Sequence, residues 1–294
     1  MSVPAAYISI VIIWSTTPLA VKFSTGGEVS FVEAAALRML GGALIAGVLL
    51  KLAGIAVPWS RDAVKSYASG ALAIFAAMTL VYWGAQYVPS GLIAVLFGLS
   101  PLITALLSQL FLGENTLSPA KIIASLLGIG GLVLIFGEQV KIDVVAAAGL
   151  LALLMAVLLY SLSGVLVKRV ALVVHPLAQT YGSLVLSLPG YALVWIVIDG
   201  SPPTQIEPLN AGLIAYLALF GSVLGFTLYF YVLSQLTVVQ VALIPLITPV
   251  IALVLGTILA GEQVGLIVMI GSALILSALI LHQWGDALFR PRLS

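Results

Sequence analysis

The chain has 294 residues, of which 62% are hydrophobic and 7% are charged, and its mean hydropathy is +1.26. A soluble domain carries roughly a quarter charged residues, so this composition excludes a water-soluble globular protein. The formal net charge of +1 offers no basic field for nucleic acid, and the absence of cysteine excludes a disulfide framework and a thiolate metal site.

Ten apolar stretches follow one another along the chain, and each is close to the ~20 residues that a helix needs to cross a bilayer. They lie at 3–22, 31–50, 66–87, 91–112, 120–137, 144–167, 177–198, 211–234, 238–259 and 265–283. The polar, proline or glycine breaks between them are too short for a further domain. The sequence therefore predicts an all-α integral membrane protein with ten transmembrane helices, followed by a tail at 285–294.

The first stretch has no Lys or Arg among residues 1–13, whereas a secretory signal needs a basic segment before its apolar core. We therefore interpret it as a retained helix. This stretch contains Trp14, which we expect to close a cavity together with Tyr160 of the sixth stretch.

Arg38 lies in the second stretch, about seven residues after Phe31 and so roughly 10 Å along the helix axis. An arginine at mid-helix costs about 2.5–3.5 kcal/mol on translocon scales, so it needs compensation. Two roles remain open: binding a substrate carboxylate, or structural pairing with a carboxylate or a helix C-terminus. Glu33 lies about 140° away around the helix, which makes pairing within the helix weak.

Aromatic and polar residues at spacings of three and four form one face of the third stretch, and similar residues recur on the eighth. We expect a substrate cavity to be lined by these residues and one from the fourth stretch: Phe75, Met78, Tyr82, Gln86, Phe97, Phe226, Tyr231 and Gln235. Ordinary packing, or anchoring at the membrane interface, explains the same residues equally well.

Prolines and glycines interrupt several stretches. Pro101, Pro245 and Pro249 would each remove a backbone hydrogen bond and bend a helix, which suits a hinge or gate, although membrane helices also tolerate proline without such a role. Gly221 and Gly225 have the GxxxG spacing, which we interpret as a close helix contact.

The two halves of the chain share motifs at a nearly constant offset. Pro101 is followed twelve residues later by Gly113-Glu114, and the motif recurs 148 residues on as Pro249 and Gly261-Glu262. We interpret both glutamates as loop or capping residues. Further matches, at offsets of 146 and 149, pair Trp14-Ser15 with Tyr160-Ser161, Lys22 with Lys168, Tyr82 with Tyr231, and Gln86 with Gln235.

An odd number of helices in each half turns the second copy upside down relative to the first. We therefore predict inverted five-helix repeats at 1–139 and 140–284, an arrangement common in secondary transporters. Duplication in a membrane protein of another kind is the alternative. Arg38 has no charged counterpart, since its repeat position is Leu184.

Positive charge tends to remain on the cytoplasmic side of the membrane. With the N-terminus inside, eight Lys and Arg residues fall on the cytoplasmic side: Lys51, Arg61, Lys65, Lys121, Lys168, Arg169, Arg290 and Arg292. The opposite side has only Lys22 and Lys141. We therefore expect both termini in the cytoplasm.

Together, the helix count, Trp14-Ser15, Arg38 and the paired proline and Gly-Glu motifs resemble the drug/metabolite transporter superfamily, over nearly the whole chain. Within it, the chain looks like the ten-helix EamA-type exporters, and in particular the aromatic amino acid exporters of the YddG type. The resemblance implies a bacterial inner-membrane protein that exports amino acids or related metabolites through a central cavity by alternating access.

No Asp or Glu lies in the middle of a predicted helix and no ATP-binding loop occurs, so the sequence favours gradient-driven movement of a small molecule without a cofactor. An intramembrane enzyme is the rival from another class. Its support is weak, because His175 and His282 lie near helix ends and no metal motif appears. A channel is a second rival. The exact solute, any coupling ion, the direction of transport and the oligomeric state stay open.

Overall fold

The computed structural model describes residues 2–113, 118–142, 144–203, 205–242, 244, 248–261 and 265–289. Within these ranges the regular elements are helices, apart from one isolated β-bridge between Gly26 and Val29. The first half contains α1 (Val3–Phe23), α2 (Phe31–Ala53), α3 (Arg61–Ala71), the π-helix η1 (Leu72–Ala77), α4 (Met78–Gly84), α5 (Ser90–Phe97), α6 (Ser100–Leu112) and α7 (Pro119–Ile142). The second half contains α8 (Val144–Val170), α9 (Pro176–Ile198), α10 (Pro208–Tyr216), the π-helix η2 (Leu217–Leu224), α11 (Gly225–Gln235), α12 (Val238–Val241), α13 (Thr248–Ala260) and α14 (Leu266–Phe289).

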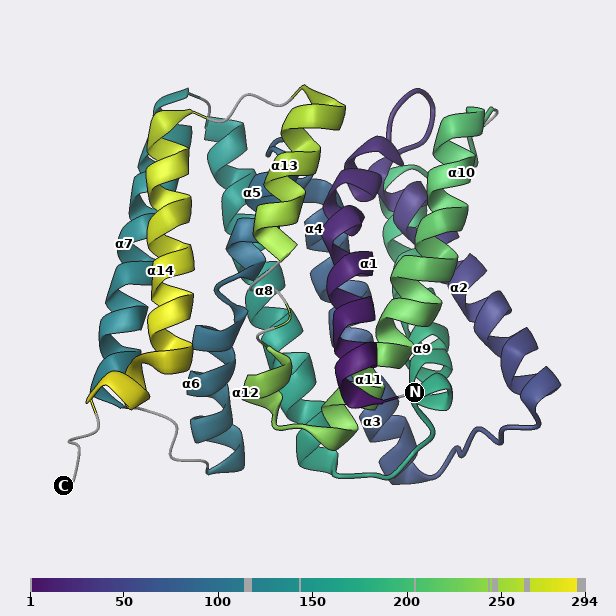
Figure 1. Cartoon of the computed structure of the whole chain (residues 1–294). Coiled ribbons are helices and arrows are strands. Elements are labelled where there is room, and N and C mark those ends of the chain that lie inside the picture. Colours follow the sequence, from purple (N-terminus) through teal and green to yellow (C-terminus); the bar gives the residue numbers. More distant parts are fainter. Residues whose placement is uncertain are drawn as a thin grey trace.

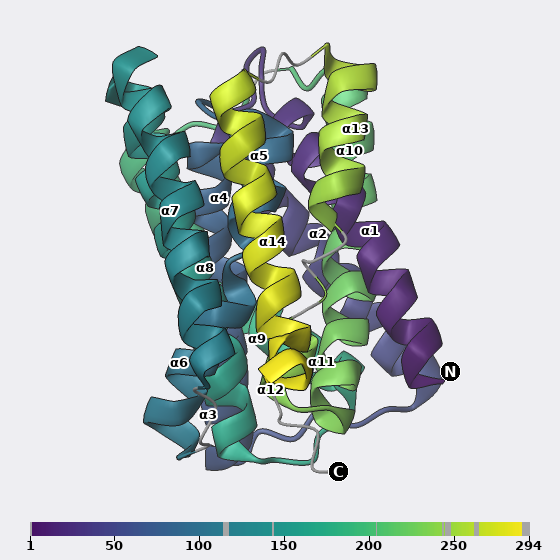
Figure 2. The same cartoon turned by 60° about the vertical axis from the view of Figure 1, so that its left-hand side comes forward.

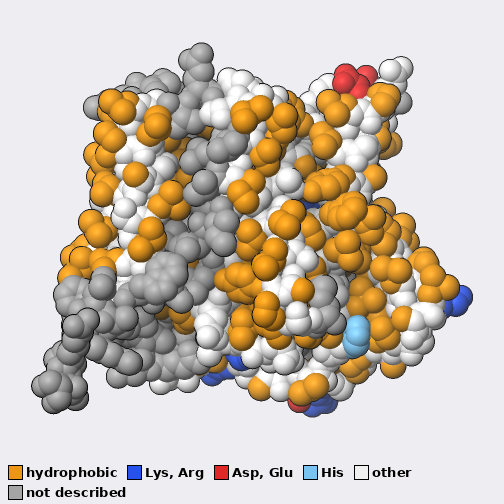
Figure 3. All heavy atoms as spheres, in the orientation of Figure 1, with side chains coloured by type: hydrophobic (Ala, Val, Ile, Leu, Met, Phe, Trp, Pro, Cys, Tyr) orange, Lys and Arg blue, Asp and Glu red, His pale blue; other side chains and the backbone are white. Residues whose placement is uncertain are grey.

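In the described part of the chain, seven helical rods are long and apolar enough to cross a membrane: α1, α2, α3 to α4, α5 to α6, α8, α9 and α10 to α11. The three other predicted ranges also hold apolar helices, in α7, α13 and α14, while the count of ten crossings stays a prediction. Apolar side chains cover the face seen in Figure 3, and several are largely exposed, such as Leu44 and Val197. Hydrocarbon rather than water is the solvent that matches such a surface.

Local signals explain where the helices begin and end. Ser30 and Glu33 form a capping box that starts α2, and Gly54 ends that helix in the left-handed conformation, with a φ of 65°. The side chain of Ser60 caps α3. α7 starts at Pro119 directly after Ser118, and a serine followed by a proline is a common start of a helix.

Both halves have a π-helical segment at the matching position. η1 starts at Leu72 and η2 at Leu217, which lies 145 residues later, and η2 is longer by two residues, with 8 against 6. Because η2 has two more residues, positions after it lie further along the chain from their counterparts in the first half. Tyr82 and Tyr231 follow the two π-helices and accordingly have the larger offset. Helices α6 and α13 both have 13 residues, and Gly113 and Gly261, which follow them, have φ values of 69° and 61°. The internal repeat is therefore present in the backbone as well as in the sequence.

The fourth predicted helix is divided in two, and this differs from a single helix bent at Pro101. α5 ends at Phe97, and Pro101 is the second residue of α6. Because proline suits the first turn of a helix, where its missing N–H has no partner to lose, the chain starts a new helix there. Pro249 is likewise the second residue of α13, and its side chain lies outside the described set, as does all of Pro245.

Helices of one half pack mainly on helices of the other (Figures 1 and 2). α2 packs on α9 and η2, α1 on α11 and α13, α5 on α13, and α7 on α14, while α3, η1 and α4 pack on α8. The two repeats thus share one core. The start of α1 and the end of α14 both lie in the lower half of Figure 1. In Figure 3 most of the visible Lys and Arg side chains lie in the lower part of the molecule, a group of acidic side chains lies at the top near the start of α10, and a further acidic side chain lies at the lower rim.

Candidate functional site

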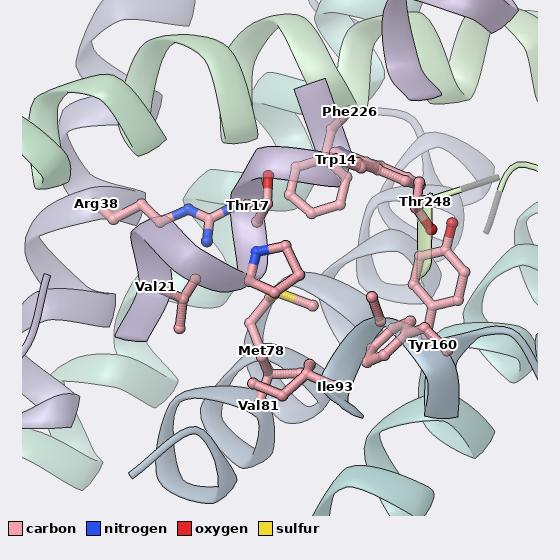
Figure 4. Close-up of a pocket in the computed structure, with 13 residues that line it drawn as sticks. Trp14, Thr17, Val21, Arg38, Met78, Val81, Ile93, Tyr160, Phe226 and Thr248 are labelled. Carbon is pink, nitrogen blue, oxygen red and sulfur yellow. The ribbon is translucent and has the colours of Figure 1, made fainter. Parts of the chain in front are cut away.

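A small cavity of about 80 Å³ lies between the two repeats (Figure 4). Residues from α1, α2, α4, α5, α8, α11 and α13 line it: Trp14, Thr17, Pro18, Val21, Arg38, Met78, Val81, Ile93, Ala94, Phe97, Tyr160, Phe226 and Thr248. Carboxylate side chains are absent from this described lining. Six of the eleven predicted substrate-binding residues meet here: Trp14, Arg38, Met78, Phe97, Tyr160 and Phe226.

Arg38 is the charged group of this cavity, and its side chain is only 1% exposed. Its Nε donates a hydrogen bond of 2.9 Å to Ser222 Oγ on η2, and its guanidinium carbon lies 5.9 Å from the ring centre of Tyr82. Its Nη1 is buried without a hydrogen-bond partner. Glu33 does not neutralise it, because that carboxylate accepts from the backbone N–H of Ser30 in the capping box. The guanidinium is therefore a buried cation with donor capacity left over.

Two glycines of the GxxxG spacing make room for site residues. A Cβ on Gly221 would lie 3.0 Å from Arg38 Nη2, and one on Gly225 would lie 2.7 Å from Trp14 Nε1. The two glycines thus let η2 approach α2 and let the start of α11 approach α1. The side chains at these two close contacts, Arg38 and Trp14, are among those that line the cavity.

Aromatic rings form the opposite end of the cavity from Arg38 (Figure 4). The ring of Trp14 lies 6.0 Å from Tyr160, 6.2 Å from Phe226 and 5.6 Å from Tyr229, measured between ring centres. Phe97 adds an edge contact with Tyr160 at 5.7 Å. The cavity therefore combines one cationic end with a wall of aromatic rings, which suits a molecule with an anionic group and an apolar body.

The model of the EamA-like transporter family matches the chain twice, over residues 3–137 and 147–282. The chain belongs to this family. The uncharacterized inner membrane transporter YedA of Escherichia coli is 26% identical over 288 residues, which cover 97% of this chain and 91% of that protein. The probable terminal-alkyne amino-acid exporter of Streptantibioticus cattleyicolor is 27% identical over 247 residues, covering 81% and 80% of the two chains. A solved crystal structure with 18% identity has a TM-score of 0.71 and covers 98% of this chain and 99% of its own, which supports the fold.

This EamA-like protein is accordingly a membrane-embedded member of a transporter family, and its helices and relatives support a multi-pass inner-membrane protein. The family and the names of its relatives point to transport of a small molecule rather than to an enzyme.

Several other predicted residues of the EamA-like protein lie away from the cavity. Phe75 packs edge-on against Tyr191, with ring centres 5.1 Å apart, because the wider turn of η1 rotates it away from Met78. Tyr82 is buried beside Arg38, and its hydroxyl has no partner. Gln86 is exposed and donates to the carbonyl of Trp83.

Tyr231 and Gln235 line a second, wider hollow of about 920 Å³ at the lower end of α8, α9 and α11. Lys168 also lies here, and its Nζ donates to the carbonyls of Leu233 and Leu236 at 2.8 and 2.9 Å, which ties α8 to the end of α11. Phe230 of α11 faces this hollow while its neighbour Phe226 lines the central cavity. Aromatic side chains of α11 thus lie between the two spaces.

Sequence reasoning missed several site residues of this family member. Thr17, Pro18 and Val21 follow Trp14 at spacings of three, four and seven, so the helical face that contains Trp14 would have revealed them. Ser222 had no such signal, since its role depends on the packing of η2 against α2. Among the described residues, no group of three His, Asp or Glu could hold a metal ion.

Proposed function

We propose that this protein exports neutral amino acids, with aromatic ones preferred, by alternating access through the cavity between its two repeats. The observation that carries the proposal is Arg38, a buried guanidinium with an unpartnered Nη1 at the edge of a cavity whose described lining holds no other charged side chain. A buried charge is stable only when it is paired, so a carboxylate from outside the chain is the group that fits this position.

The remaining wall suits the rest of such a substrate. Rings of Trp14, Tyr160 and Phe226 offer an apolar surface of the kind that packs against a side chain such as that of phenylalanine. The Streptantibioticus relative is named a probable terminal-alkyne amino-acid exporter, which supports the same substrate class.

The size of the cavity supports a mechanism that requires movement. Its volume of about 80 Å³ is below the ~300 Å³ at which ligand pockets begin, so the aromatic rings must separate when substrate enters. Phe226 lines the cavity and Phe230 lines the lower hollow, so we infer that these two rings separate the two spaces and close the cavity on that side. With the termini in the cytoplasm, the lower hollow would be the cytoplasmic entrance. Alternation then requires α11 to move away from α1 and α8.

Reconstituted protein tests the proposal. Liposomes that contain the purified protein should take up radiolabelled phenylalanine, tryptophan or leucine, and should ignore sugar phosphates. Arg38→Met should abolish this uptake, and Arg38→Lys should retain part of it, because lysine keeps the charge and loses the fork geometry. Gly212→Ala serves as control, since its new methyl group would meet nothing within 4 Å.

Two results would overturn the proposal. Uptake that is the same in Arg38→Met and in the control would remove the carboxylate role. Uptake that unlabelled amino acid on the opposite side never accelerates would indicate a channel instead of a carrier.

A further inference from the structure

An amino acid brings an ammonium group as well as a carboxylate, and the cavity lining has no Asp or Glu to receive it. The inference below rests on the proposed function and concerns that second group. An ammonium has three N–H donors, so backbone carbonyls or hydroxyl oxygens can replace an acidic partner if their lone pairs are available.

Pro18 makes one backbone carbonyl available. It lies inside α1, and because proline has no N–H, the carbonyl of Trp14 loses the donor that would normally come from residue 18. Trp14 and Pro18 both line the cavity, so this carbonyl lies on the face of α1 that borders it.

Thr17 supplies a second acceptor on the same face. Its Oγ1 lies 3.0 Å from the carbonyl oxygen of Ile13, and since a carbonyl only accepts, the hydroxyl must donate its proton there. With its proton on that carbonyl, the Thr17 oxygen keeps lone pairs that can accept from a ligand in the cavity. Thr17 and Arg38 line the same small cavity, so the two charged groups of an α-amino acid, which share one carbon, would each find a partner there.

We propose that the carbonyl of Trp14 and the hydroxyl of Thr17 accept hydrogen bonds from the substrate ammonium while Arg38 binds the carboxylate. Pro18 is then a specificity-determining residue, because its missing N–H leaves the carbonyl open. The arrangement favours zwitterionic amino acids over carboxylates of the same shape that lack the ammonium.

Two probes that differ only in the ammonium test this assignment: phenylalanine and 3-phenylpropanoate. Pro18→Ala restores an N–H that binds the carbonyl of Trp14, and Thr17→Val removes the hydroxyl with little change in shape. Each should weaken phenylalanine binding by about tenfold, the scale of one hydrogen bond to a charged group, and should change 3-phenylpropanoate binding by less than about twofold.

Pro189→Ala is the matched control. Pro189 also lies inside a helix, α9, but it is exposed and outside the cavity lining, so its replacement should leave the affinity for both probes unchanged. Binding is measured on purified protein that elutes as a single species, by calorimetry or by competition for a labelled substrate.

Equal weakening of both probes by Pro18→Ala and Thr17→Val would indicate a packing role and overturn the assignment. Unchanged binding of phenylalanine in both variants would overturn it too. In either case, loss of both probes in Arg38→Met would leave the proposed function standing. Wild-type protein that binds no amino acid would instead remove the proposed function itself.

Discussion

Three glycines along one helical rod, α10 to α11, allow a graded test of the site. A methyl group on Gly212 would meet nothing within 4 Å. One on Gly221 would meet Arg38 Nη2 at 3.0 Å, and one on Gly225 would meet Trp14 Nε1 at 2.7 Å and the carbonyl oxygen of Phe220 at 3.1 Å. Replacing each by alanine therefore applies the same chemical change at three levels of crowding.

The expected stabilities follow from two opposed contributions. Alanine stabilises a helix interior by about 0.5–1 kcal/mol relative to glycine. Overpacking costs about 1–3 kcal/mol where neighbours cannot move. Gly212→Ala should thus gain up to about 1 kcal/mol, and Gly221→Ala should be nearly neutral, because a flexible guanidinium can give way by a few tenths of an ångström. Gly225→Ala should lose up to about 2 kcal/mol, since an indole ring and a backbone oxygen both oppose it.

The effects of the three substitutions on uptake should not simply follow their effects on stability. Gly221→Ala displaces the guanidinium, so we expect uptake of phenylalanine to fall severalfold although its thermal unfolding temperature in detergent changes little. Gly225→Ala should lose uptake and unfold at a lower temperature, and Gly212→Ala should match wild type in uptake. If Gly221→Ala and Gly225→Ala transported as well as Gly212→Ala, the placement of Arg38 and Trp14 at the substrate would be refuted.

The remaining predictions concern the support of the helices and their orientation. Lys168→Met removes two hydrogen bonds to the end of α11, so it should lower the free energy of unfolding by about 1–3 kcal/mol. An unchanged unfolding temperature would show that these hydrogen bonds do not hold α8 and α11 together. Tyr191→Phe removes the hydroxyl that donates to the carbonyl of Ile74 in η1 at 2.6 Å, and it should cost about 0.5–1.5 kcal/mol, the net contribution of one hydrogen bond. Equal stability would show that η1 needs no such partner. The chain has no cysteine, so single cysteines can report on its topology. A membrane-impermeant thiol reagent applied to intact cells should label Ile206→Cys, on the predicted outer side, and should spare Val173→Cys, on the predicted cytoplasmic side. The reverse pattern would invert the predicted topology.

Much of the architecture could be predicted because hydrophobic length and repeated motifs are local properties of the sequence. The described helices follow the predicted apolar stretches, and the family match covers both repeats. Arg38 is buried, in line with its depth in the second stretch, and Trp14 and Tyr160, which occupy matching positions in the two halves, contact each other at the cavity.

The details of the site could not be predicted because they depend on contacts between distant segments. The π-helical turns are one example, since nothing local in Leu72–Ala77 distinguishes an i→i+5 pattern from an ordinary α-helix. They separated Phe75 from Met78, which the regular spacing had placed on one face. Tyr231 and Gln235 line the lower hollow because they lie in the last turns of α11. The spacing of residues along the sequence does not show where that helix ends in space.

The solitary charge of Arg38 has a kinetic consequence for a protein that changes conformation within a membrane. Under the alternating access proposed above, the vacant protein reorients with a buried guanidinium that has no carboxylate partner in the cavity lining, whereas a bound carboxylate would cancel that charge. Resetting of the vacant protein should therefore be slower than passage of the occupied one. Exchange of a substrate inside for a substrate outside would then be faster than net export. The concentration of substrate outside the cell would therefore set the rate of turnover.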